Sequence, residues 1–186
     1  MNLLSEPATI LTLVPKPTDP PHFWWVNQRQ NFEDEARNGV LRAPLRPHEC
    51  YLNVGRLRRG DIVVHHVAGL IRAVGLVACN PVEMRDPLGI ETGRIRVGNV
   101  GYHFLDQPVV LADLPNAWKL DENAREALVV RGDALNYRPF DCHGGAIQAY
   151  LFGLSENFMQ QLFDIPEFAG AFERATGGQG VLKEAR

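Results

Sequence analysis

Residues 23–31 read FWWVNQRQN, an apolar run followed at once by a cluster of amide side chains. Aromatic and β-branched residues favour a strand over 23–27, and so compact an apolar run indicates a buried one. Neighbouring side chains of a strand point to opposite faces of its sheet. We therefore expect one of Trp24 and Trp25 to anchor the core, and the other, which we take to be Trp25, to face a pocket.

The amides after the tryptophans indicate what such a pocket would hold. Asn27, Gln28 and Asn31 each carry a hydrogen-bond donor and an acceptor, which suits them to the edge of a nucleobase. The alternative is local, because Asn27 and Gln28 could satisfy backbone groups at the strand end and Asn31 could cap a helix. The stretch thus predicts a strand that ends at a pocket for one flat ring with a polar edge.

Turn residues divide the rest of the chain into short strands and helices. A helix over 30–38 is predicted to end at Asn38-Gly39, and a strand over 40–43 to end before Pro44. The clearest strand, residues 62–67, forms a hairpin with residues 70–78, in which Gly75 indicates a bulge or a sharp bend. Further strands are predicted at 94–97, 100–104, 109–111 and 146–152, and further helices at 121–130, 157–163 and 166–175.

This order of elements predicts a mixed α+β fold, a small twisted β-barrel flanked by helices, because it has no β-α-β rhythm. Residues 1–21 are rich in proline and are expected to form an extended arm. Residues 22–176 are expected to form the folded domain, and residues 177–186 a glycine-rich tail or linker.

Composition limits the class of protein. The chain has 186 residues, of which 45% are hydrophobic and 22% charged, as in one soluble globular domain. No apolar run approaches the roughly 18 residues that span a bilayer. The N-terminus lacks the basic start and apolar core of a signal peptide, so we expect a cytoplasmic protein with no membrane partner. Cys50, Cys79 and Cys142 are widely spaced, which predicts reduced thiols rather than disulfides or a zinc ribbon.

Charge is unevenly distributed although the net charge is only −3. Residues 22–100 hold 11 Arg against 8 acidic residues, whereas residues 101–186 hold 7 basic against 12 acidic ones. Of the 19 basic residues, 16 are arginine, the residue suited to bidentate phosphate and base contacts. A GC-rich genome explains the arginine bias as well, but it does not explain the difference between the two halves.

Motifs that carry catalysis are missing from the sequence. It contains no nucleophile elbow, phosphate-binding loop, zinc-protease helix, dinucleotide fingerprint or nuclease signature. His65 and His66 are neighbours in a strand, so they cannot simply ligate one metal ion. Cys142 and His143 could form a catalytic pair, but a chain with three cysteines and six histidines contains such a neighbouring pair readily by chance. We therefore predict no catalytic residue, no metal and no cofactor.

Several segments, in this order, resemble a known family. They are WWVNQ at 24–28, GVLRAP at 39–44, RRGD at 58–61 with the strand after it, and GAIQAYL at 145–151. Together they resemble the EVE-like branch of the PUA superfamily, whose relatives include YTH domains. The chain is similar, over roughly residues 22–165, to the N-terminal readers of modification-dependent restriction endonucleases of the McrB and EVE–HNH kinds.

The resemblance implies a PUA-like fold and a specific task. A modified base would be flipped out of double-stranded DNA into an aromatic pocket, and a fused or associated nuclease or other effector would act on the DNA. Flipping costs a few kcal/mol, stacking on an aromatic side chain returns about 1–3 kcal/mol, and a buried methyl group adds about 1 kcal/mol. Such a reader therefore needs rings and amides together.

Sixteen residues are candidates for this task. The modified-base pocket is predicted to include Trp24, Trp25, Asn27, Gln28, Asn31, Leu41, His65, His66, Gln148 and Tyr150. The DNA backbone is predicted to contact Arg29, Arg42, Arg46, Arg56, Arg58 and Arg59.

Several alternatives stay open at the level of sequence. Relatives often carry Trp where this chain has Leu41, so N6-methyladenine, 5-methylcytosine, 5-hydroxymethylcytosine and a glucosylated base are all candidates for the ligand. The target could also be RNA, as for YTH and PUA relatives. A third interpretation is a small-molecule-sensing or enzymatic barrel that uses Cys142 and His143.

Overall fold

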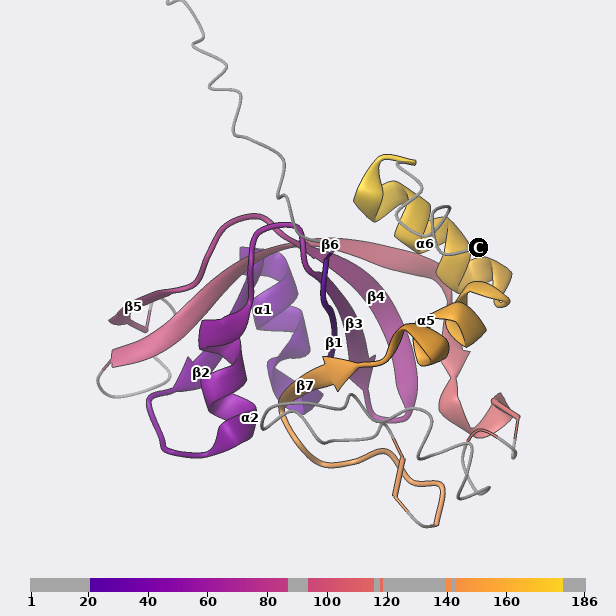
Figure 1. Ribbon diagram of the computed structural model, residues 1–186, viewed down its shortest axis with the longest axis horizontal. Coiled ribbons are helices and arrows are strands. Elements are labelled where there is room, and N and C mark those ends of the chain that lie inside the picture. The colour runs from indigo at the N-terminus through magenta and orange to yellow at the C-terminus, as the bar shows by residue number, and fades with distance from the viewer. Residues whose placement is uncertain (1–20, 87–93, 116–117, 119–139, 142, 179–186) are drawn as a thin grey trace, which may run out of the picture.

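In a computed structural model of the protein, the described residues are 21–86, 94–115, 118, 140–141 and 143–178. Seven strands form one curled sheet with helices packed beside it (Figure 1), which confirms the α+β fold class. The strands are β1 (Phe23–Asn27), β2 (Val40–Pro44), β3 (Ile62–Val67), β4 (Leu70–Val77), β5 (Val82–Arg85), β6 (Arg94–Val110) and β7 (Leu151–Leu154). The helices are α1 (Phe32–Asn38), α2 (Glu49–Leu52), α5 (Glu156–Phe163) and α6 (Pro166–Thr176), with 3-10 turns η1 (Arg29–Asn31), η2 (Asn53–Arg56) and η3 (Leu111–Asp113).

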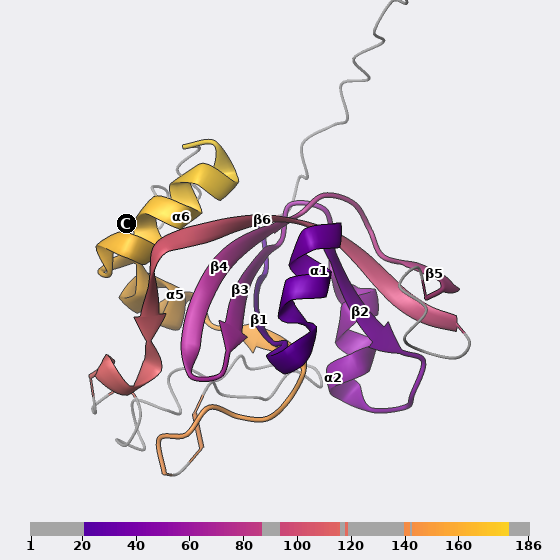
Figure 2. The same ribbon diagram turned by 180° about the vertical axis from the view of Figure 1, so that it is seen from behind.

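The sheet has the strand order β2-β6-β4-β3-β1-β7, and β5 pairs with β6 outside this path. β1 pairs in parallel with β3 and antiparallel with β7. A parallel pair needs a long crossover, and here it contains α1, β2, α2 and η2. Figure 2 shows α1 and α2 beside β2, and α5 and α6 near the other end of the sheet. The crossover thus brings α2 close to the end of β1, where the chain leaves the sheet.

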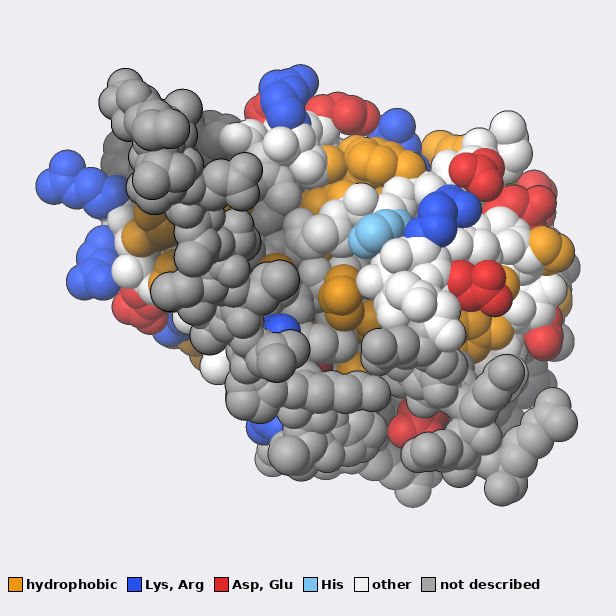
Figure 3. Space-filling view, turned by 90° about the horizontal axis from the view of Figure 1, so that it is seen from above, with side chains coloured by type: hydrophobic (Ala, Val, Ile, Leu, Met, Phe, Trp, Pro, Cys, Tyr) orange, Lys and Arg blue, Asp and Glu red, His pale blue; other side chains and the backbone are white. Residues whose placement is uncertain are grey.

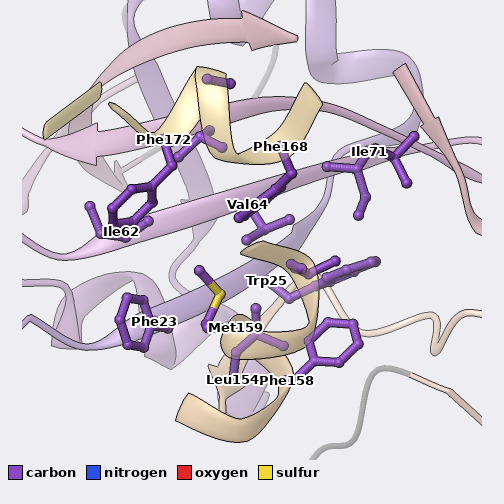
Figure 4. Packing of buried hydrophobic residues seen from close by; sticks show 14 of the residues in the cluster. Phe23, Trp25, Ile62, Val64, Ile71, Leu154, Phe158, Met159, Phe168 and Phe172 are labelled. Atoms are coloured by element: carbon purple, nitrogen blue, oxygen red, sulfur yellow. The ribbon is translucent and has the colours of Figure 1, made fainter. Parts of the chain in front are cut away.

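The two tryptophans of β1 lie in different parts of the core, as strand alternation predicts. Trp25 packs with Phe152 and Phe158 at ring-centroid distances of 6.2 and 6.1 Å, under α5 and α6 (Figure 4). Trp24 packs in a second cluster with Leu41 and donates its indole N–H to Asp61 at 2.9 Å. Both side chains are fully buried, so both anchor the core.

β6 corrects the prediction of three separate strands between residues 94 and 111. It is one strand of 17 residues, because its first half pairs with β2 and β5 and its second half with β4. Gly98 looks like a turn residue in the sequence, but it lies in close contact with Leu57. A Cβ at Gly98 would be 3.1 Å from a Leu57 methyl carbon, so the glycine serves packing.

Of the two alternatives predicted for Gly75, the bulge is wrong. The irregularities of the hairpin lie at His65/His66 and at Ile71/Ala73. At Gly75 a Cβ would be 2.4 Å from His65 Nε2 and 2.5 Å from Val100 Cγ1. The glycine is needed because the imidazole ring of His65 occupies the space that a side chain would fill.

The predicted end of the first helix at Asn38-Gly39 is confirmed, although α1 begins at Phe32 and the 3-10 turn η1 precedes it. Gly39 ends α1 in the left-handed conformation with φ 62°, and Ser155 caps α5 by accepting the Phe158 N–H at 3.2 Å. The predicted strand over 146–152 is shorter and later, at β7. The predicted helix over 121–130, residues 1–20 of the arm and most of the tail lie outside the described residues. Every helix of the described part is too short or too polar to span a membrane.

Candidate functional site

A cleft opens where β1 ends, between the loop after β1, helix α2 and the segment before β7. The end of β1 is tied to that segment by the Asn27 N–H, which donates to the Tyr150 carbonyl at 2.7 Å. The cleft has a volume of about 320 Å³, within the range of about 300–1,000 Å³ for small-ligand pockets. Its lining includes Asn27, Asn31, His48, Tyr51, Gln148 and Tyr150.

Two tyrosine rings give the cleft its aromatic wall. Tyr51 from α2 and Tyr150 have ring centroids 6.0 Å apart with planes inclined by 47°. Both side chains are partly exposed, so a flat ligand could stack on them. A smaller hollow of about 150 Å³ adjoins both tyrosines and Asn31, and it includes the exposed Arg46.

Buried polar groups lie directly behind the Tyr150 ring. The Glu35 carboxylate is fully buried and accepts the Tyr150 hydroxyl at 3.1 and 3.2 Å. It also accepts the Gln28 amide at 2.6 Å and the Arg42 backbone N–H at 3.2 Å. The Gln28 oxygen in turn lies 2.7 Å from His65 Nδ1. The network therefore fixes the wall of the cleft from the inside.

Burial sets the protonation of this network. It raises the pKa of Glu35 from its ordinary value of 4.5 to about 7, against the lowering effects of Gln28, Arg42 and Tyr150. The pKa of Tyr150 is raised well above 10, by burial first and by the Glu35 charge second. Burial lowers the pKa of His65 to about 3, so this imidazole is neutral at pH 7.

Four of the predicted pocket residues lie together in the lining of the cleft. Asn27, Asn31, Gln148 and Tyr150 all border the cleft, although the Asn27 amide donates to the Ile147 carbonyl at 3.3 Å. Gln28 borders it too, but its side chain is turned inward to the buried network. The amide most available to a ligand is therefore that of Asn31, because the Gln148 amide donates to the Ala146 carbonyl at 3.0 Å and its oxygen accepts from the Arg29 guanidinium.

The other predicted pocket residues lie away from the cleft. Trp24, Trp25, Leu41 and His65 pack in the core, and Trp25 and Leu41 belong to different clusters. A stacking role for either tryptophan stays a prediction that requires the core to open. His66 lines a different cavity, on the side of Trp25.

The predicted arginines separate into three groups. Arg29 and Arg46 are exposed at the cleft and at the adjoining hollow. Arg42 is buried, and its guanidinium pairs with Asp86 at 3.0 Å. The remaining three lie outside the cleft lining, with Arg56 at the end of η2 and Arg58 and Arg59 in the turn between η2 and β3.

Sequence reasoning missed Tyr51 and His48, which supply rings to the cleft, because α2 has only four residues and no amphipathic repeat. It also missed the arginines at the far end of the sheet. Figure 3 shows Lys and Arg side chains projecting at the end that carries β5, where Arg85 and Arg94 are exposed.

Comparison with solved structures finds distant similarities of fold. The Pho92 YTH domain in complex with m6A matches at a TM-score of 0.49 and 10% identity, over 83% of this chain and 87% of that one. The YTH domain of Zygosaccharomyces rouxii MRB1 with N6-methyladenosine RNA matches at a TM-score of 0.47 and 12% identity, over 82% and 92%. A hypothetical protein from Leishmania major matches at 0.49 and 10%, over 81% and 97%. No protein-family model matches the chain, and no curated protein does.

Proposed function

We propose that this protein reads a modified nucleobase in DNA, and that the cleft at the end of β1 holds the base. The observation that supports this most is the combination of two tyrosine rings with amide side chains, that of Asn31 among them, in a cleft of about 320 Å³. A flat ring with a polar edge is the ligand that suits such a lining.

In this proposal the flipped base stacks on the tyrosine wall and the Asn31 amide meets its edge, while the Gln148 amide would exchange its bond to the Ala146 carbonyl for one to the base. Stacking supplies about 1–3 kcal/mol, and the few kcal/mol that flipping costs are recovered only with the edge contacts added. The buried network behind Tyr150 keeps the wall rigid, so that less entropy is lost when the base binds.

The exposed Arg29 and Arg46 would hold the phosphates on either side of the flipped nucleotide. The sequence carries no nuclease signature, so the domain would supply specificity to a fused or associated effector of a modification-dependent restriction system. The modified base is one of the four named from the sequence.

A binding assay with fluorescent duplexes tests the proposal. Duplexes of one sequence would carry N6-methyladenine, 5-methylcytosine, 5-hydroxymethylcytosine, glucosylated 5-hydroxymethylcytosine or no modification. We expect at least about tenfold tighter binding to one modified duplex, and loss of that preference in Tyr51→Ala. Equal affinity for all five duplexes would refute the proposal.

RNA is the main rival ligand, and the Zygosaccharomyces rouxii structure holds N6-methyladenosine RNA. Matched DNA and RNA oligonucleotides with N6-methyladenine should therefore compete in one assay. Tighter binding of the RNA would assign the cleft to RNA recognition and exclude the restriction role.

Thiol chemistry in the same cleft is a second candidate function. Cys50 Sγ lies 2.9 Å from His48 Nδ1, and both residues border the cleft. Cys142, the cysteine suggested by the sequence, lies outside the described residues. A Cys50→Ser variant should bind modified DNA as the wild type does if the domain is a reader. Failure of that variant to bind, with its fold intact, would favour the thiol.

A further inference from the structure

The hollow beside the cleft is lined by the end of β2 and by the start of the loop that leads to α2 (Figure 1). Its volume is about 150 Å³. Asn31, Tyr51 and Tyr150 border both the hollow and the cleft. A ligand that fills the cleft can therefore extend into the hollow across these three side chains.

The walls of the hollow are held in place by contacts within the protein. Pro44 of β2 pairs with Ile95 of β6, and both residues border the hollow. The Arg46 backbone N–H donates to the Pro44 carbonyl at 2.8 Å, which closes a tight turn at the start of the loop. Tyr150 is fixed through its hydroxyl by the buried Glu35 carboxylate. Because the hollow is preformed, little further ordering is needed when a ligand enters it.

Two polar groups at the boundary between the cleft and the hollow are free to bind a ligand. The Asn31 amide does not cap α1, and neither it nor the Tyr51 hydroxyl has a hydrogen-bond partner in the described part of the chain. Both side chains are partly exposed, and their polar atoms are in contact with solvent. Arg46 is exposed at the same hollow, and the proposed function leaves its cation to a phosphate.

The size and polarity of the hollow suit a substituent much larger than a methyl group. A methyl group is about as large as a water molecule, whose share of liquid volume is about 30 Å³, so most of the hollow would stay unfilled. A methyl group would also displace water from Asn31 and Tyr51 without replacing its hydrogen bonds, which lowers affinity. A substituent with several hydroxyl groups fills the space and replaces those bonds, because a hydroxyl both donates and accepts.

We propose that the hollow holds a sugar attached to the modified base, so that the protein reads a glycosylated base such as glucosylated 5-hydroxymethylcytosine. This inference rests on the proposed function of the cleft, and it selects one of the four bases named from the sequence. The base would stack on the tyrosine wall, and the sugar would lie between Pro44 and the Tyr51 hydroxyl. Asn31 would bond the ligand where the sugar joins the base.

Fluorescence anisotropy with the wild-type protein and the duplexes described above tests the proposal. We expect the glucosylated duplex to bind at least about tenfold more tightly than the 5-methylcytosine duplex, the gain that two additional hydrogen bonds of ordinary strength provide. Equal or tighter binding of the duplex with 5-methylcytosine, 5-hydroxymethylcytosine or N6-methyladenine would overturn the proposal.

A Pro44→Phe variant tests the hollow itself, because a phenyl ring beside Ile95 would fill it. The variant should bind the glucosylated duplex at least about tenfold more weakly and the 5-methylcytosine duplex within about twofold of the wild type. Pro47→Phe makes the same exchange at an exposed position of the same loop, outside both linings, and it should bind every duplex as the wild type does. Equal weakening of all duplexes by Pro44→Phe, with its thermal unfolding unchanged, would show that the hollow holds the DNA backbone, contrary to the proposal.

Tyr51→Phe keeps the proposal testable if Pro44→Phe does not fold, because it removes a hydroxyl and retains the ring. The ratio of the affinities for the glucosylated and the 5-methylcytosine duplex should fall by about two- to tenfold, the effect of one lost hydrogen bond. An unchanged ratio would mean that the Tyr51 hydroxyl does not contact the sugar, and the proposal would be overturned.

Two results separate this inference from the proposed function. If the wild type shows no preference for any modified duplex, the function of the cleft fails and the sugar site loses its basis. If the wild type prefers a methylated base to the unmodified and the glucosylated ones, the function of the cleft stands and only the sugar site fails.

Discussion

Tyr150 connects the surface of the cleft with the interior. Its ring borders the cleft, while its hydroxyl is held by the Glu35 carboxylate and lies 3.2 Å from the Arg42 backbone N–H. The two parts of one side chain therefore have different roles. The ring is placed to contact a ligand, and the hydroxyl keeps the ring in position.

Substitutions of Tyr150 should separate these two contributions. Tyr150→Phe removes the hydroxyl alone, and the unfolding free energy should fall by about 1–2 kcal/mol while binding of the modified duplex stays within about twofold. Tyr150→Ala removes the ring as well, and binding should weaken by about 1–3 kcal/mol. Urea titration and fluorescence anisotropy measure the two effects. Equal weakening of binding in both variants would show that the hydroxyl, not the ring, is what the ligand requires.

Glu35 should make stability depend on pH with an unusual sign. Its pKa is about 7 in the folded protein and near 4.5 when exposed, so the folded state holds the extra proton between these values. Stability from this group is therefore complete below pH 4.5 and is lost as pH rises to about 7. His65 and His66 act oppositely, because burial lowers their pKa values from 6.5 to about 3 and 4, so they favour the folded state more as pH rises to 6.5.

A Glu35→Gln variant isolates the carboxylate, because both histidines are retained and their contribution cancels in the comparison. Relative to this variant, the wild type should lose up to about 3 kcal/mol of unfolding free energy between pH 4.5 and pH 7.5. Urea unfolding at a series of pH values measures the difference. A difference that is constant with pH would mean that Glu35 ionises in the folded protein as it does in water.

Only part of the site could be predicted from single residues. Asn31 was predicted from its amide chemistry, Gln148 and Tyr150 were predicted from the resemblance to a known family, and all three border the cleft. The two tryptophans were predicted to line the pocket because they are large aromatic residues. β1 is buried along its whole length, however, so both rings pack in the core. Glu35 lies in the first turn of α1 beside two other acidic residues, a pattern typical of a solvent-exposed helix face. Its burial depends on the crossover that lays α1 against β2, which no local pattern reveals.

At the scale of elements, side chains from β3 and β6 pack closely over Gly75 of β4. The pair Gly75 and Tyr102 lies in register, and the Tyr102 ring packs on His65 at 4.1 Å. This contact also supports the buried network, because Gln28 donates to the Tyr102 hydroxyl at 2.8 Å. The absence of a side chain at Gly75 is therefore a condition for placing His65.

Gly75→Ala should destabilise the protein by about 1–3 kcal/mol or more, because the added methyl would overlap His65 and Val100. Gly101→Ala is a matched control on the neighbouring strand, where the nearest atoms would be 3.8 Å away or farther. We expect the control to change the unfolding free energy by less than about 0.5 kcal/mol. Thermal and urea unfolding measure both. Similar losses of stability in the two variants would show that glycine is needed for strand flexibility and not for space.

Elements with strong local signals were predicted well, and those without them were not. The hairpin of β3 and β4 and the capped helices α1, α5 and α6 follow from alternation and turn residues. β5 and α2 have four residues each, too few for a periodic pattern. The continuity of β6 depends on partner strands on both of its edges, so the sequence pattern predicted three short strands in its place.

For the whole molecule, the uneven charge seen in the sequence corresponds to two separate places. Arg29 and Arg46 lie at the cleft and its adjoining hollow, whereas Arg85 and Arg94 lie at the end of the sheet that carries β5 (Figure 3). Each group could attract DNA over a distance, but only the first could hold phosphates beside a flipped base. The salt dependence of binding distinguishes them, since each phosphate that the protein neutralises releases counterions.

The double variant Arg29→Ala/Arg46→Ala should weaken binding at low salt and flatten its salt dependence. The slope of log K against log salt concentration should fall in magnitude by about 0.9 for each phosphate that is no longer neutralised, or about 2 in all. The preference for the modified base should remain, because phosphate contacts carry no sequence information. Arg85→Ala/Arg94→Ala removes the same charge from the other end and should leave the slope within about 0.5 of the wild-type value. If the second pair changes the slope as much as the first, the DNA crosses the β5 end of the sheet, and the cleft at the end of β1 is not where its phosphates are held.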